Sequence, residues 1–167
     1  MKSIRSAPEL YAHAIAIEQE GAERYSELAE RMADEANDAV AEVFGMLAQA
    51  EAEHFDALKR RTDGIALPHI APGQYAWLDA GAPETAAREF LFRLMTPHNA
   101  LAIALAAEKR AQAFFEHVLM TADDPALRAL AREMAMEEAE YVALVERLLE
   151  RTPEPSLHTQ LLFAKED

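Results

Sequence analysis

Hydrophobic positions recur every three to four residues along four long stretches of the chain, which predicts four amphipathic helices. Capping residues followed closely by proline mark three of the starts: Ser6 with Pro8, Thr96 with Pro97, and Asp124 with Pro125. The predicted helices span about 7–34, 38–63, 97–122 and 125–151. Each is long enough to present a continuous apolar face, so an all-α fold is expected.

The connections between these helices differ in length. Short links join the first helix to the second and the third to the fourth, which predicts two antiparallel hairpins. The middle connection, 64–96, is long and rich in Pro and Gly, with an amphipathic stretch at 84–94 that predicts a short helix. Two hairpins joined by one long crossover form the ferritin-like antiparallel four-helix bundle. We therefore expect one bundle over 1–152 and a peripheral tail over 153–167.

Each predicted helix carries one glutamate at the centre of its hydrophobic face. On a wheel of about 100° per residue, acidic neighbours such as Glu20 and Glu53 point outward, where charges are solvated. The glutamates that fall inside the apolar stripes are Glu18, Glu51, Glu108 and Glu138. One turn after the second of them, His54 lies on the same face.

Carboxylates that converge in a core predict a bound cation. They would repel one another, and burying each would cost several kcal/mol without a neutralising charge. Glu51 and His54 are three residues apart on one helix face, so both can bind the same ion. Carboxylates with an imidazole suit iron or manganese better than zinc or copper. The pattern predicts a two-metal site inside the bundle.

The two hairpins also resemble each other in sequence. Segment 14–18, with an aromatic residue seven positions after its glutamate, matches segment 104–108. Segment 50–54 likewise matches 137–141, except that the second segment ends in tyrosine instead of histidine. Such a repeat indicates a duplicated hairpin with a pseudo-twofold site at its centre.

Over about residues 7–150, this pattern resembles the ferritin-like superfamily and most closely its rubrerythrin branch. Five of the six expected ligand positions occur in the expected order: Glu18, Glu51, His54, Glu108 and Glu138. The resemblance implies that Glu51 and Glu138 bridge two iron ions. It implies further that Glu18 and His54 complete the first metal position and that Glu108 helps to complete the second.

The resemblance also implies a chemistry. Such centres bind ferrous ions, react with peroxide or dioxygen, and are reduced again by outside electrons. The sequence contains no rubredoxin-like segment, so an external electron donor protein is expected. Ala111 stands where rubrerythrins often carry an additional glutamate. Bacterioferritins, which are more distant, bind haem through a methionine near the position of Ala52, and no haem is expected here.

Tyr141 occupies the sixth ligand position and has two interpretations. A buried tyrosine is usually a core aromatic whose hydroxyl is hydrogen-bonded. Alternatively, its phenolate could bind ferric iron, although an ordinary phenol has a pKa of about 10. Tyr25 and Gln112 lie near the same level and could supply an oxygen or a water bridge. On the wheel, His13 faces away from the core and is not expected to replace the missing ligand.

Composition and charge exclude several classes of function. The chain has no cysteine, which excludes thiolate nucleophiles, cysteine-bound zinc and iron–sulfur clusters. Its formal net charge is −14 without a basic patch, so nucleic acid is not an expected partner. The longest apolar run, 100–107, is far shorter than the roughly 20 residues of a membrane span. Glu9 and His13 interrupt any apolar leader, so a cytoplasmic protein is expected.

The same apolar run bears on assembly. It is apolar all round, because Ile103 and Ala106 on its outer side are apolar as well. A helix of this kind is covered on every face. Either the crossover or a second subunit covers it, and we expect a homodimer.

Three functional hypotheses follow. The first is a di-iron oxidoreductase that reduces hydrogen peroxide or oxidises ferrous iron, with manganese or another divalent metal as an alternative to iron. The second is a non-catalytic metal-binding protein in which Tyr141 has degraded one metal position. The third, a structural bundle without metal, is disfavoured by the four core carboxylates.

Overall fold

The computed structural model describes residues 4–70 and 95–154, and within them it contains four long helices. They are α1 (Ala7–Asp34), α2 (Asp38–Arg61), α4 (Pro97–Thr121) and α5 (Pro125–Arg151). The helix ends predicted from capping and proline signals agree with these bounds to within two residues. The predicted crossover helix at 84–94 and most of the tail lie outside the described residues.

Side-chain caps explain why three of the helices begin where they do. The Ser6 hydroxyl accepts a hydrogen bond from the amide of Glu9 at 3.3 Å, and Thr96 accepts one from the amide of Asn99 at 3.1 Å. Asp124 caps α5 in the same manner. Each cap satisfies an amide that the helix leaves unpaired, and replacing such a cap by alanine typically costs about 1 kcal/mol.

The turn between α1 and α2 is held differently. Ala36 adopts a left-handed backbone conformation with φ of 57°. Asn37 precedes α2 but makes no side-chain cap to it. Its amide group instead donates a hydrogen bond to the carbonyl of Met95 at 2.8 Å. This bond fastens the first hairpin's turn to the residues that lead into α4.

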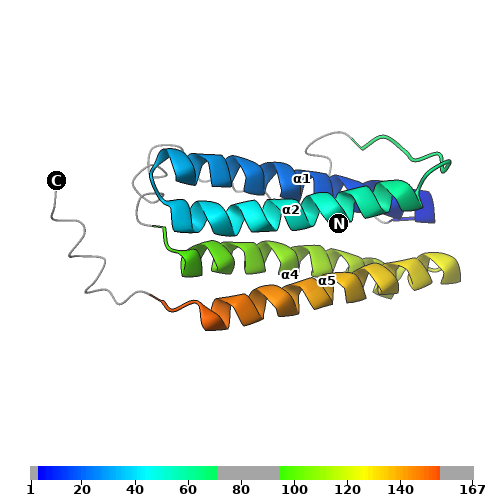
Figure 1. Ribbon diagram of the computed structural model, residues 1–167. Helices are drawn as coiled ribbons and strands as arrows, with labels where there is room; N and C mark the ends of the chain where they lie inside the picture. Colours follow the sequence, from blue (N-terminus) through cyan, green and yellow to red (C-terminus); the bar gives the residue numbers. More distant parts are fainter. Residues whose placement is uncertain (1–3, 71–94, 155–167) are drawn as a thin grey trace.

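The helices form two antiparallel hairpins that lie against each other as two layers, α1 with α2 and α4 with α5 (Figure 1). α2 ends at one end of the bundle and α4 begins at the opposite end (Figure 1). At 1.5 Å per residue, the 24 residues of α2 extend for about 36 Å, which the connection between them has to recross. The all-α bundle of two hairpins with one long crossover is thereby confirmed.

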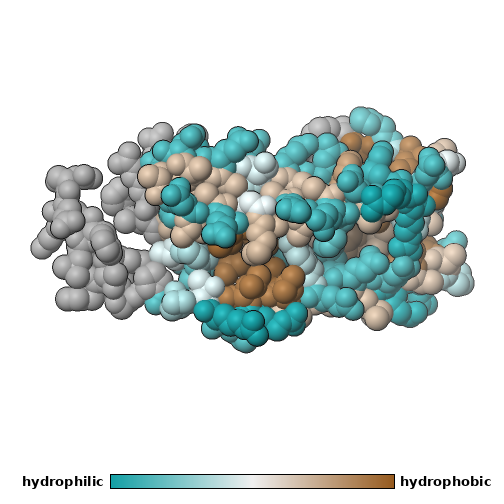
Figure 2. Space-filling model, viewed as in Figure 1, coloured by the Kyte–Doolittle hydropathy of each residue, from teal (hydrophilic) through white to brown (hydrophobic). Residues whose placement is uncertain are grey.

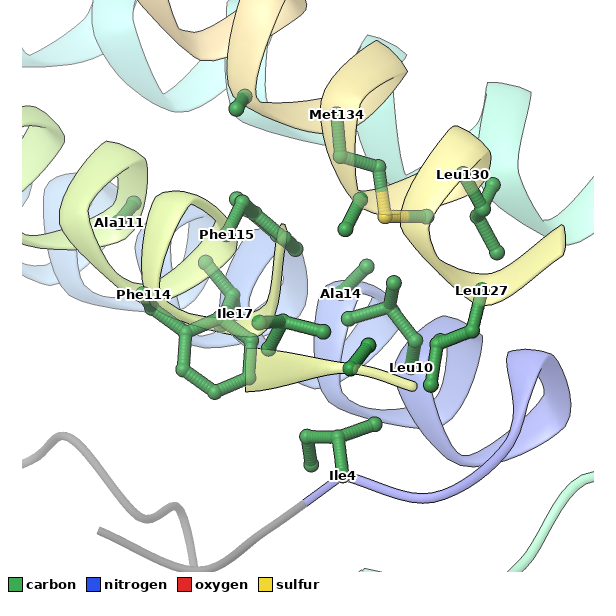
Figure 3. Close-up of a cluster of buried hydrophobic side chains, with 14 of the residues drawn as sticks. Ile4, Leu10, Ala14, Ile17, Ala111, Phe114, Phe115, Leu127, Leu130 and Met134 are labelled. Carbon is green, nitrogen blue, oxygen red and sulfur yellow. The ribbon is translucent and has the colours of Figure 1, made fainter. Parts of the chain in front are cut away.

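The apolar core consists of two clusters placed one after the other along the bundle. Figure 3 shows the first, which includes Leu10, Phe114 and Leu127. The second cluster includes Phe44 and Leu101.

Each helix has side chains in both clusters, and its core glutamate lies between these two groups of residues along the helix. On α1, Ile17 packs in the first cluster and Tyr25 in the second, with Glu18 between them in the sequence. On α4, Ala104 lies in the second cluster and Ala111 in the first, on either side of Glu108. The carboxylates therefore form a charged level between two apolar cores.

One prediction about α1 was wrong. His13 was expected to face outward, but its side chain is only 1% exposed. Its ring centre lies 5.7 Å from that of Phe114 on α4. The helical wheel assumed a single apolar stripe, whereas α1 is also covered on the side that faces Phe114. His117 is exposed, as expected.

The outer side of α4 is apolar and uncovered by the described residues. Ile103 is 47% exposed, and Ala106 is also exposed. Coverage of this surface by the crossover or by a second subunit stays a prediction. None of the described helices combines the length and the hydropathy needed to cross a membrane.

Candidate metal centre

Four glutamates, one from each described helix, lie buried between the two apolar clusters. Glu18, Glu51, Glu108 and Glu138 are each at most 9% exposed. Their acidic neighbours Glu23 and Glu53 lie on the surface. The four glutamates that helical periodicity placed in the core are therefore buried there.

Three of the predicted ligands lie close enough to hold one ion. Ligand atoms of Glu18, Glu51 and His54 all lie within 4.8 Å of one another. Nδ1 of His54 is 3.4 Å from Oε2 of Glu18. Ligand atoms at about 2.1 Å from a metal lie up to about 4 Å apart, so small side-chain movements would bring this group around an ion. The His54 side chain is 46% exposed, which opens the group to solvent.

The other two glutamates interact electrostatically with this group. Burial, together with the charges of Glu108 and Glu18, raises the pKa of Glu51 to about 11. Burial together with Glu18 and Glu108 raises the pKa of Glu138 to about 9. The pKa of Glu108 rises to about 7, mainly by burial. Without a cation, the cluster therefore retains protons at neutral pH.

A metal fits this donor set. Oε1 of Glu51 and the hydroxyl of Tyr141 are buried and have no hydrogen-bond partner among the described residues. Buried polar atoms in native proteins are nearly always paired, so the Glu51 oxygen requires a proton or a cation and the Tyr141 hydroxyl requires a hydrogen-bond partner. Divalent ions would replace the retained protons and neutralise the carboxylates.

Tyr25 is the residue that supports Glu108. Its hydroxyl donates a hydrogen bond of 2.8 Å to Oε1 of Glu108. This bond lowers the pKa of Glu108, opposing the effect of burial. The sequence placed Tyr25 near the level of the site and left its role open. Gln112, proposed for a similar role, instead donates to Glu116 at 2.9 Å.

Tyr141 lies at the edge of the cluster, beside the exposed histidine. It is 8% exposed, and its ring lies edge-on to that of His54 with centres 5.2 Å apart. The core interpretation is confirmed for the ring, but the hydroxyl lacks the expected hydrogen bond within the described residues. Burial, followed by the charge of Glu51, raises the pKa of Tyr141, so the metal-free protein holds it as a neutral phenol.

Sequence reasoning missed Gly21, which gives Glu51 its space. A Cβ at this position of α1 would lie 2.9 Å from Oε2 of Glu51. Glycine inside a helix costs about 1 kcal/mol relative to alanine, so a lone glycine in the middle of α1 was the available signal. The reason for a glycine at this position is the closeness of Glu51 on α2, and the sequence alone does not give the distance between the two helices.

Comparisons with known proteins agree with this site. The rubrerythrin family profile matches residues 9–74, which hold Glu18, Glu51 and His54. The chain is also similar to an uncharacterized conserved protein from Magnetospirillum magnetotacticum, whose crystal structure is known at 2.00 Å resolution. The two are 36% identical with a TM-score of 0.72, over 91% of this chain and 99% of the other. No curated protein matches the chain.

Proposed function

Because this chain belongs to the rubrerythrin family of ferritin-like proteins, we propose that its carboxylate level binds two iron ions and reduces peroxide or oxidises ferrous iron. The family and the group of Glu18, Glu51 and His54 fit a di-iron protein. The observation that carries the proposal is that four buried carboxylates from four helices meet at one level. Water solvates the charges of an exposed acidic cluster, whereas buried carboxylates need a cation or protons to neutralise them.

The proposed ligands divide between two positions. Glu18 and His54 would complete the first position, and Glu108 the second. Glu51 on α2 and Glu138 on α5 would serve both positions, as the family resemblance implies. Manganese satisfies the same hard donor set. An external electron donor protein and a homodimer are further parts of this proposal.

The chain's own groups would hold and orient the reactants. Two ferrous ions, when bound, would supply the two electrons that cleavage of an O–O bond requires. Tyr25 fixes the orientation of the Glu108 carboxylate through its hydrogen bond. The Tyr141 hydroxyl, unpartnered among the described residues, could donate a hydrogen bond to an oxygen of the bound peroxide.

Anaerobic loading with ferrous iron tests the proposal. Elemental analysis should find two irons per chain, and rapid mixing with hydrogen peroxide should oxidise both. Glu18→Gln should lose iron, whereas Glu23→Gln, an exposed position on the same helix, should bind like the wild type. One iron or fewer per chain, without a response to peroxide, would contradict the proposal.

A second candidate function is metal binding without catalysis. It is favoured by one observation, that only Glu18, Glu51 and His54 form a ligand group among the described residues, while Tyr141 stands in the sixth position. In that case Tyr141→His, which adds a ring nitrogen beside Glu138, should convert a chain that binds one iron into one that binds two. A wild-type chain that binds two irons and oxidises both with hydrogen peroxide would exclude this candidate.

A further inference from the structure

A groove of about 580 Å³ opens beside the carboxylate cluster, and the proposed reaction with hydrogen peroxide does not account for it. A water molecule occupies about 30 Å³ in the liquid, and hydrogen peroxide is only slightly larger. A volume of 580 Å³ is instead within the range of pockets that bind small organic molecules. The groove therefore has room for a ligand many times larger than hydrogen peroxide.

The groove runs between α2 and α5 and reaches the cluster in its middle. Its lining on α5 extends from Met134 to Arg147, which at 1.5 Å per residue is about 20 Å. Glu18, His54 and Glu138 form the part that belongs to the cluster. Figure 2 shows hydrophobic surface gathered between α2 and α5. A molecule lying in the groove would thus touch the metal ligands and apolar walls together.

Apolar and charged side chains share the lining of the groove, and Arg61 and Arg147 are its two arginines. Leu58, Met134 and Leu144 line it, and Leu144 is 42% exposed. Arg61 at one end is held by Glu133 at 2.6 Å. Glu137 and Glu140 add negative charge to the α5 side. An anionic ligand would be repelled near the cluster, whereas a neutral apolar group gains from burial along the walls.

One polar group in the groove lacks a hydrogen-bond partner within the described part of the chain. Tyr141 lines the groove, is 8% exposed, and has a hydroxyl without a hydrogen-bond partner among the described residues. A neutral phenol can donate one hydrogen bond. It stands next to His54, so a ligand oxygen close to the cluster would come within its reach.

We propose that the groove binds the apolar organic part of a hydroperoxide, ROOH, and places its O–O bond at the carboxylate cluster beside Tyr141. Reduction breaks the O–O bond and consumes two electrons and two protons, giving ROH and water. Two ferrous ions supply the electrons and become ferric, and the external donor protein reduces them again. This inference rests on the proposed di-iron function and names its substrate class.

Cumene hydroperoxide is a suitable probe because its organic part is a neutral aromatic group. Its rate constant for oxidising the ferrous-loaded protein is compared with that of hydrogen peroxide by anaerobic rapid mixing. Ala57→Phe fills the groove from an exposed position on α2, and Ala52→Phe adds the same side chain to an exposed position outside it. Because burial of a phenyl group is worth roughly a tenfold or larger factor, the ratio of the two rate constants should fall about tenfold in Ala57→Phe. It should stay at the wild-type value in Ala52→Phe.

A second readout does not involve metal or turnover. Cumyl alcohol, the product, should bind the metal-free protein and shift the methyl NMR signals of Met134 and Leu144, and Ala57→Phe should abolish these shifts. Equal rate-constant ratios in the two variants, with hydrogen peroxide still reacting, would overturn the groove's role and leave the proposed function standing. Failure of both peroxides to oxidise the ferrous protein would overturn the proposed function, and this inference with it.

Discussion

The hydroxyl of Tyr25 on α1 donates a 2.8 Å hydrogen bond to Glu108 on α4, across 83 residues of sequence. This contact joins the two hairpins at the level of the carboxylates. It also opposes part of the rise in the pKa of Glu108 that burial causes. Tyr25 therefore keeps one of the four carboxylates ready to lose its proton when a cation binds.

Tyr25→Phe removes this hydrogen bond while keeping the ring in the apolar cluster. Partners that orient a metal ligand are typically worth a factor of about 10 to 100 in metal affinity. We expect affinity for ferrous iron to fall by about that factor, measured by anaerobic calorimetric titration. Tyr11→Phe, at a ring that packs under Arg61 instead, is the control and should bind iron normally. Equal affinities in the two variants would show that Tyr25 does not support the site.

Glu51→Gln should stabilise the metal-free protein and destroy its response to metal. Glu51 is 4% exposed and its pKa is raised to about 11, so at neutral pH the folded chain keeps it protonated while the unfolded chain ionises it. Ionisation of the unfolded chain favours unfolding, and a glutamine of the same size removes it. We therefore expect the free energy of unfolding in chelator to rise by roughly 1–3 kcal/mol. Ferrous iron should no longer add stability. Glu53→Gln, exposed on the same helix, should change neither quantity.

Stability of the metal-free protein should fall as pH rises from 5 to 8. The pKa values of Glu108 and Glu138 are raised from 4.5 to about 7 and about 9 in the folded chain. Above pH 4.5 the unfolded chain releases these protons, whereas the folded chain keeps them. The contribution of the two carboxyl groups to the free energy of unfolding is therefore full at low pH and is lost as the pH rises through their raised pKa values. Each retained proton changes stability by about 1.4 kcal/mol per pH unit.

Urea unfolding in chelator between pH 5 and 8 measures this dependence. Glu108→Gln should flatten the curve between about pH 5 and 7 and change its slope little at higher pH, which separates the cluster from the general effect of surface charge. Iron affinity should show the reverse trend and increase with pH, because binding displaces the same protons. Unfolding midpoints that increase from pH 5 to 8 in chelator would contradict the assigned pKa shifts.

Gly21→Ala should separate helix stability from metal binding. Alanine favours a helix by about 1 kcal/mol over glycine, but here its Cβ would lie 2.9 Å from Oε2 of Glu51. The carboxylate must then move, and iron affinity should fall at least about tenfold. Gly45→Ala is the control, because nothing lies within 4 Å of its Cβ, and it should be stabilised with unchanged iron binding. Identical iron affinities would show that Glu51 has room to adjust.

Local chemistry explains which parts of the fold could be predicted from sequence. Ser6, Thr96 and Asp124 cap helices through amides two or three residues away, so the helix starts were readable. The core glutamates were readable because helical periodicity needs only the apolar neighbours on the same helix.

Features that depend on a distance between helices could not be predicted in this way. His13 was misplaced because its burial comes from Phe114 on another helix. The need for Gly21 depends on the position of Glu51 on α2. The groove exists because of the separation between α2 and α5, for which no single stretch of sequence carries a signal.

The charged level between the two apolar clusters has a consequence for how the molecule unfolds. Hydrophobic packing is interrupted halfway along the bundle, so the molecule consists of two short cores in series. With protons alone at the junction, either half can loosen while the other stays packed. Ions bound there would tie all four helices together and make the halves unfold as one unit, so the sharpness of the thermal transition becomes a measure of how much metal the protein carries.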